Sequence, residues 1–189
     1  MTIQLSRLFV LGATLCSLLA PAPVIGQNQE KAAKQAEVRT KAMETLEAFY
    51  KADPALKQAV AKAPGYAVFT TYGISFLVGG AGGKGLAHDN RTKKNTYMEL
   101  GQASAGLQAG ASDTRYLFLF QDQKALANFI EKGWDASAGG IASGGTGEKS
   151  VGGGAAAFTG GKLYMLTKTG LQAGVAVAGT KAWKDKELN

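Results

Sequence analysis

Two glycine-rich stretches carry a lysine in the manner of phosphate-binding loops. Residues 80–85 read Gly-Ala-Gly-Gly-Lys-Gly and fit the G-x-G-x-x-G pattern, and residues 147–150 read Gly-Glu-Lys-Ser, which resembles the end of a P-loop. The first pattern has meaning only between a strand and a helix, whereas residues 86–90 run into a polar turn. The second has one residue too many between Gly147 and Lys149 for a P-loop. We therefore expect neither stretch to bind a nucleotide.

The residues needed for catalysis are sparse. His88 is the only histidine, so a zinc site of three or four nitrogen and sulfur ligands cannot be assembled, and a Ser-His-Asp triad would have to use it. It lies beside Asp89 at the edge of an expected hairpin, where a solvated histidine is the simpler interpretation. Carboxylate-pair hydrolysis needs two acids that converge on a cleft, and the acidic residues share no spacing. The sequence predicts a protein that is not an enzyme and uses no metal or cofactor.

The charge balance favours an acidic partner. Lys and Arg number 21 against 14 Asp and Glu, a formal net charge of +7. For an exported protein, anionic lipid headgroups are the commonest acidic surface. Lysines beside glycine turns or flexible loops are the candidates to bind phosphate oxygens, and aromatic rings would lie at the headgroup boundary. These candidates are Lys84, Lys149, Lys162 and Lys168, with Trp134, Trp183 or Phe69 as the aromatic residue. The alternative is that the lysines are merely solvated and the rings belong to the core.

The N-terminal segment predicts export. Arg7 precedes an apolar run at residues 8–20, and small or short residues before Gln27 fit a signal-peptidase site. A signal peptide over residues 1–26 would include Cys16, the single cysteine, and leave no thiol chemistry in the mature chain. The expected location is the periplasm or the exterior, with a peripheral association with the membrane.

Periodicity predicts an α+β fold for the rest of the chain. A helix is expected over residues 27–52, with Met43, Leu46, Phe49 and Tyr50 as its apolar stripe. The domain proper spans residues 53–185 and opens with a short helix after Asp53-Pro54. Short strands are expected at residues 66–71, 74–81, 84–88, 95–100, 102–112, 116–120, 162–167 and 170–179.

Further signals mark the connections of this domain. Asp122 caps a helix that Gly133 ends. A glycine-rich loop covers residues 139–154. The chain ends in a basic tail that contains Lys181, Trp183, Lys184 and Lys186, and residues 186–189 lie beyond the expected domain. The pentapeptide Gly-Leu-Gln-Ala-Gly occurs at residues 106–110 and 170–174, with one strand face stripped of bulk. The sheet should be glycine-rich, mostly antiparallel and strongly curved or barrel-like, with an N-terminal helical segment and one helix after the central strands.

Six stretches agree in order and spacing with those of a known family, at residues 63–69, 79–85, 102–110, 118–129, 133–134 and 179–184. On these residues the chain resembles the SYLF lipid-binding domain family. It implies non-enzymatic binding of anionic membrane lipids. The yeast branch of the family also binds actin, a partner not expected for a bacterial exported member.

Two other functions stay open. An envelope interaction module would use a sheet edge to bind protein. A carrier would enclose an apolar ligand in a cavity lined by Phe76, Val78, Leu107 and Leu171.

Overall fold

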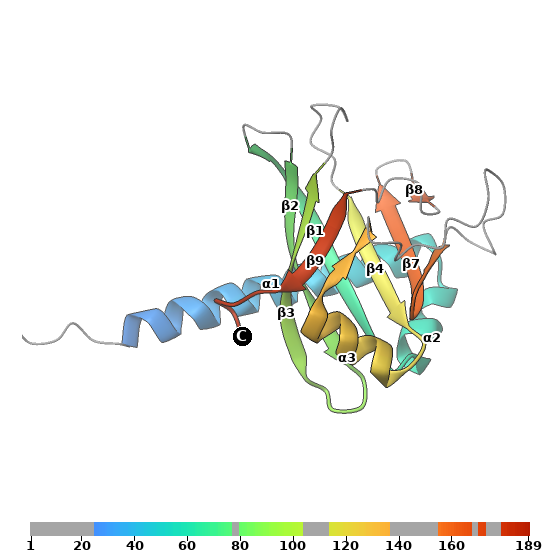
Figure 1. The fold of residues 1–189 in the computed structure, drawn as a ribbon, viewed down its shortest axis with the longest axis horizontal. Helices are drawn as coiled ribbons and strands as arrows, with labels where there is room; N and C mark the ends of the chain where they lie inside the picture. Colours follow the sequence, from blue (N-terminus) through green and yellow to red (C-terminus); the bar gives the residue numbers. More distant parts are fainter. Residues whose placement is uncertain (1–24, 77–79, 104–113, 137–154, 168–169, 173–178) are drawn as a thin grey trace, which may run out of the picture.

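The protein is one antiparallel sheet with helices on both of its faces (Figure 1). The computed structural model describes residues 25–76, 80–103, 114–136, 155–167, 170–172 and 179–189. The predicted signal peptide up to residue 24, the predicted loop at 139–154 and the first pentapeptide lie outside the described residues, as do Lys149 and Lys168. The helices are α1 (Ile25–Ala52), α2 (Ala55–Lys62) and α3 (Gln123–Lys132).

The strands run in the order β5-β9-β3-β2-β1-β4-β7-β6, with β8 paired to β7 outside this path, and every pairing is antiparallel. Their bounds are β1 (Gly65–Phe76), β2 (Gly80–Asp89), β3 (Asn95–Ala103), β4 (Arg115–Phe120), β5 (Trp134–Asp135), β6 (Ala155–Phe158), β7 (Gly161–Thr167), β8 (Gly170–Gln172) and β9 (Thr180–Lys184). The predicted fold class is thereby confirmed.

Three strand predictions are wrong in their boundaries. The expected strands at 66–71, 74–81 and 84–88 are two longer ones, β1 and β2. Gly83 and Gly85 lie inside β2 and not in turns, and at both positions the neighbouring backbone leaves no room for a side chain. A Cβ on Gly85 would lie 2.0 Å from the carbonyl oxygen of Val68, and one on Gly83 would lie 2.5 Å from that of Thr70.

The expected basic tail is also corrected. Residues 180–184 form β9, which lies between β3 and β5 in the sheet. Leu188 is buried, and the side chain of Asn189 accepts from the backbone N–H of Tyr97 and donates to its carbonyl. The last residues therefore form part of the packed structure.

One face of the sheet, which we call the α3 face, holds an aromatic core. Phe118 on β4 contacts the rings of Phe69, Phe129, Trp134 and Phe158 at centroid distances of 5.0–5.8 Å. The apolar run of β4 predicts this central position, and Asp122 caps α3 as predicted, through the backbone N–H of Ala125. Phe69 is 1% exposed, so its predicted place at a headgroup boundary is wrong. Its ring is part of the core.

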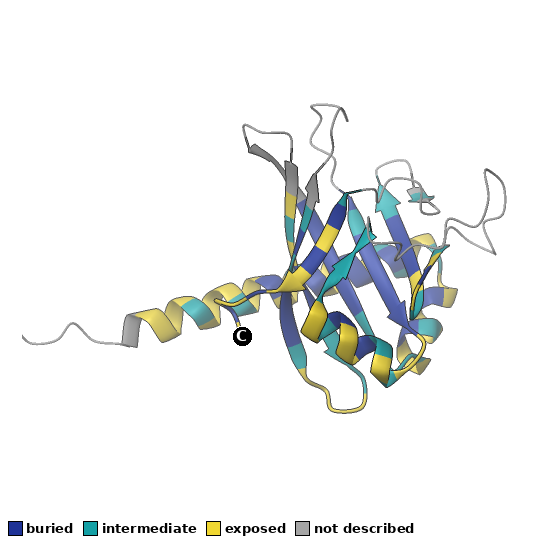
Figure 2. Cartoon of the chain, in the orientation of Figure 1, coloured by how far each residue is buried: buried dark blue, intermediate teal, exposed yellow. Residues whose placement is uncertain are grey.

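The opposite face, the α1 face, is covered by α1 and α2 (Figure 2). Val38, Ala42, Leu46 and Phe49 of α1 are buried, a spacing of three or four residues that keeps them on one side of the helix. Met43 was expected in this stripe, but it lies one residue further around the helix and is 65% exposed. Among the parts of the chain that the structure describes, no helix combines the length and apolarity needed to cross a bilayer.

Candidate functional site: a groove beside Trp183 and a basic end

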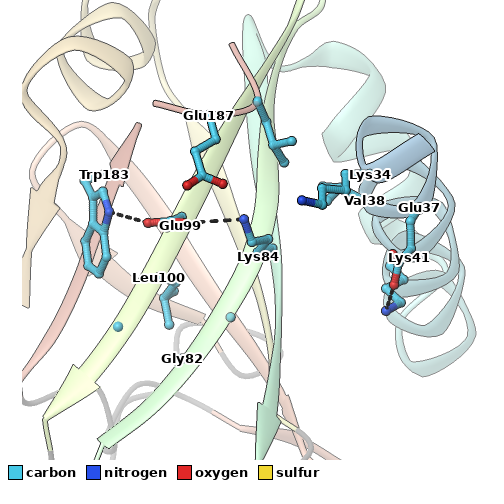
Figure 3. Close-up of a pocket in the computed structure, with 13 residues that line it drawn as sticks. Lys34, Glu37, Val38, Lys41, Gly82, Lys84, Glu99, Leu100, Trp183 and Glu187 are labelled. Carbon is cyan, nitrogen blue, oxygen red and sulfur yellow. Dashed lines mark hydrogen bonds and ion pairs between the residues drawn. The ribbon is translucent and has the colours of Figure 1, made fainter. Parts of the chain in front are cut away.

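Three side chains form a row across the α1 face. Lys84 on β2 lies opposite Glu99 on β3, which lies opposite Trp183 on β9. Directly opposed residues of antiparallel strands point to the same face, so the three side chains are neighbours. The indole Nε1 of Trp183 donates to Glu99 Oε2 at 2.7 Å, and the other Glu99 oxygen lies 3.4 Å from Lys84 Nζ (Figure 3). Glu99 therefore ties the lysine to the tryptophan.

The next row carries no side-chain bulk. Gly82 and Gly101 lie opposite each other on β2 and β3. The Trp183 ring lies over Gly101, where a Cβ would come within 2.8 Å of the ring, and the ring is 43% exposed. Because neither glycine has a side chain, the backbone of Gly82 and Gly101 forms a flat shelf beside the exposed Trp183 ring.

We call the space above this shelf the Trp183 groove. It has a volume of about 660 Å³ and lies between α1, strands β2, β3 and β9, and the C-terminal residues. Val38 and Leu188 give it apolar walls, and Leu100 lines it through its backbone, since its side chain lies in the core of the α3 face. Its rim carries Lys34, Glu37, Lys41, Lys84, Glu99 and Glu187. Acidic and basic residues on the rim are equal in number, so the groove is not an anion site by charge.

Ion pairs and hydrogen bonds hold this rim together. Lys34 pairs with Glu30, and Lys41 with Glu37. Lys84 Nζ donates to Asp185 Oδ2 at 2.8 Å, and Asp185 is 1% exposed.

The pair of Lys84 and Asp185 anchors the C-terminal segment. The second oxygen of Asp185 accepts from the backbone N–H groups of Glu187 and Leu188. Burial acts to raise the pKa of Asp185, but Lys84 and these N–H groups outweigh it and hold the pKa below its ordinary value. For Lys84, burial acts to lower the pKa, but the hydrogen bond to Asp185 and the nearby carboxylates raise it on balance. The ammonium group of Lys84 is thus already engaged by two carboxylates.

A second feature lies at the turn between β2 and β3. Arg91, Lys93 and Lys94 are exposed there, and in the described part of the chain their side chains form no ion pair or hydrogen bond. Asp89 fixes the turn by accepting from the backbone N–H groups of Arg91 and Thr92. The side chain of Lys93 projects from a left-handed backbone, at φ 60°.

Hydrogen bonds also connect the turn to α2 and α3. The amide of Asn90 donates to the carbonyl oxygens of Val60 and Ala63, both at 2.8 Å, at the end of α2. Gln123, the first residue of α3, donates to Asp89. The cations of the turn therefore stand on a rigid support.

Further lysines gather at the same end of the sheet. Lys62 ends α2, and Lys124 is the second residue of α3. Lys162 is the second residue of β7, near the end of β4 at Phe120. All three are exposed. Figure 1 shows the turn, α2 and the start of α3 at this end. Asp122 is engaged as a helix cap, and Glu131 beside Lys94 offsets part of the charge.

We call this surface the basic end. It consists of Lys62, Arg91, Lys93, Lys94, Lys124 and Lys162.

The structure separates the predicted lipid-binding residues. Lys84 and Trp183 meet in the Trp183 groove, while Lys162 lies at the basic end. Trp134 is half-buried against Phe118, and its Nε1 is buried without a partner in the described residues. That these residues bind lipid stays a prediction. The cations of the β2–β3 turn were not singled out, although three basic residues in four, at positions 91–94, were a visible signal.

A curled antiparallel sheet with helices on both faces defines an α+β domain. The family model described as Ysc84, Las17-binding protein actin regulator, matches residues 101–189. Beta cell expansion factor A of Aeromonas veronii is 32% identical over 164 residues, which cover 84% of this chain and 60% of that protein. The chain thus spans less than two thirds of this relative's length. These similarities confirm the resemblance to the SYLF family.

Proposed function

We propose that this protein is exported and binds the surface of membranes that contain anionic phospholipids, without catalysing a reaction. The observation that carries the proposal is the set of cations on the fixed β2–β3 turn, Arg91, Lys93 and Lys94, whose side chains form no ion pair among the described residues. The resemblance to the SYLF family supports the same function. An actin role, which the family description names, is not part of the proposal.

Charge and rigidity together favour a membrane surface as the partner. Each lysine or arginine near an anionic bilayer contributes about 1 kcal/mol to binding. Because the turn is fixed by Asp89 and Asn90, its three cations meet the surface without first being ordered. Lys62, Lys124 and Lys162 extend the contact to either side.

Vesicle co-sedimentation tests the proposal. The protein should bind vesicles of phosphatidylcholine mixed with phosphatidylglycerol, bind pure phosphatidylcholine far less, and lose affinity as salt is raised. A triple variant, Arg91→Gln, Lys93→Gln and Lys94→Gln, removes about 3 kcal/mol by the same rule, which is a loss of roughly 150-fold in affinity.

A matched triple variant separates the basic end from net charge. Lys132→Gln, Lys184→Gln and Lys186→Gln removes the same charge from exposed positions outside the basic end. We expect it to bind nearly as well as the unaltered protein. Equal binding to neutral and anionic vesicles would contradict the proposed function, and equal losses in the two triple variants would contradict the assignment to the basic end.

A further inference from the structure

Gly82 lies inside strand β2, and the packing around it does not require a glycine. A Cβ on Gly82 would meet only the carbonyl oxygen of Leu100, at 3.9 Å, which is ordinary contact distance. By contrast, a Cβ on Gly83 or Gly101 would collide with a neighbour at 2.5 or 2.8 Å. Glycine inside a strand lowers stability. Gly82 lines the Trp183 groove, so its lack of a side chain keeps the floor of the groove clear at the expense of some stability.

The groove has the size and lining of a site for a small apolar ligand. Its volume of about 660 Å³ lies within the range of roughly 300–1,000 Å³ typical of ligand pockets. The floor is the backbone of Gly82, Leu100 and Gly101, the sides are Val38 and Leu188, and the exposed Trp183 ring forms one wall. A ligand with a long hydrocarbon surface can contact all of these at once.

The rim shows which charge the ligand carries within the groove. Lys84 is engaged by Asp185 and Glu99, and Glu99 also accepts from Trp183. On α1, Lys34 and Lys41 pair with glutamates one turn away. An anionic group entering the groove would have to break one of these lysine pairs, whereas an uncharged chain would leave all of them intact.

We propose that the Trp183 groove binds a single aliphatic chain that brings no charge into the groove, such as the acyl chain of a neutral monoacylglycerol. The site differs from the basic end in place and in chemistry, because Gly82 and Gly101 lie toward the far end of the β2–β3 pair from the turn at residues 89–94. Binding of a chain here does not require the proposed membrane contact, so either proposal can fail alone.

Contact quenching of Trp183 tests this proposal. The protein contains two tryptophans, and Trp134→Phe leaves Trp183 as the sole reporter. A monoacylglycerol with a brominated acyl chain, added below its micelle concentration, should quench Trp183 fluorescence in a saturable manner. Gly82→Ile places four carbons on the groove floor and should weaken this binding by at least about tenfold, a change of 1.4 kcal/mol. Gly82→Ala should have a smaller effect in the same direction.

Three comparisons make the outcome decisive. Lys184→Ile adds the same side chain on the opposite face of β9 and should leave quenching unchanged. The unfolding midpoint of Gly82→Ile should not fall, because the added Cβ has room. The triple variant of the basic end should be quenched as strongly as the unaltered protein.

Several results would overturn the proposal. Unchanged affinity in Gly82→Ile and Gly82→Ala would mean that the chain does not occupy the groove. No saturable quenching by the neutral lipid, or quenching only by the brominated fatty acid anion, would reject an uncharged aliphatic ligand. Vesicle binding by the basic end would stand in any of these cases.

Discussion

Replacement of Asp185 by alanine should destabilise the protein and release the first half of α1. Asp185 is 1% exposed and accepts from Lys84 Nζ at 2.8 Å and from the backbone N–H groups of Glu187 and Leu188 at 2.8 and 3.0 Å. A hydrogen bond to a charged group contributes about 1.5–3 kcal/mol, and the three share one carboxylate, so we expect a loss of about 3 kcal/mol in the free energy of unfolding. For a domain of this size the loss corresponds to a fall of about 6–12 °C in the melting temperature.

The local consequence follows from the contacts of the C-terminal residues with α1. Lys31 donates to the backbone oxygen of Asn189, and Gln35 donates to that of Leu188. When the turn after Asp185 opens, these bonds and the burial of Val38 against Leu188 and Tyr97 are weakened. Amide hydrogen exchange should therefore accelerate around Val38, while the backbone amides of β4 keep their relative protection.

The assay has a matched control in another carboxylate that pairs with a lysine. Glu30→Ala removes the exposed pair with Lys34 on α1 and should leave the melting temperature nearly unchanged. The reasoning is refuted if Asp185→Ala melts within a degree or so of the unaltered protein, or if Glu30→Ala destabilises it equally.

Two further predictions concern pH and backbone conformation. Burial acts to raise the pKa of Asp185, but Lys84 and the N–H groups lower it on balance. The ionised carboxylate therefore stabilises the fold at pH values above the ordinary pKa of an aspartate. This contribution is lost as the pH falls below about 4. Denaturant titrations should show a shallower acid decline in Asp185→Asn than in the unaltered protein, and parallel declines would contradict the role. Gly133 has φ 74° and ψ −170°, a region open essentially to glycine alone, and a Cβ there would lie 2.4 Å from the carbonyl oxygen of Ala182. Gly133→Ala should therefore cost at least about 2 kcal/mol in the free energy of unfolding, whereas Gly82→Ala should be nearly neutral or stabilising.

Local patterns predicted those elements whose structure is decided locally. The cap at Asp122 and the glycine stop at Gly133 define α3 because their hydrogen bonds and backbone angles are short-range. The run of apolar residues in β4 predicts a strand buried on both faces, as observed. The alternation in β9 was obscured by its basic composition, because Lys181 and Lys184 dominate a window of only five residues. Pairing with β3, about eighty residues earlier, decides that this segment is a strand.

The candidate site depended even more on distant partners. Lys84 and Trp183 were both selected from the sequence, but their common contact with Glu99 exists only when β2, β3 and β9 are in register. Likewise, no local signal distinguishes Gly82, which has open space beside it, from Gly83, which packs against Thr70. The sequence predicts the turn at residues 89–94. The hydrogen bond from the Asn90 side chain to α2, which holds this turn in place, joins residues far apart in the chain and has no local signal.

The position of β9 has a consequence for the order in which the molecule matures. The hairpins β1–β2 and β2–β3 join neighbouring segments and can form early, whereas β9 pairs with β3 only after about eighty further residues have been made. Domains that rely on such distant pairings fold slowly. Trp183, Leu188 and Asp185 all come from this final segment, and they meet α1 from the opposite end of the described chain. The Trp183 groove therefore cannot form before β9 has been made, so occupancy of the groove would report that β9 has paired with β3 and that the residues after it have packed against α1.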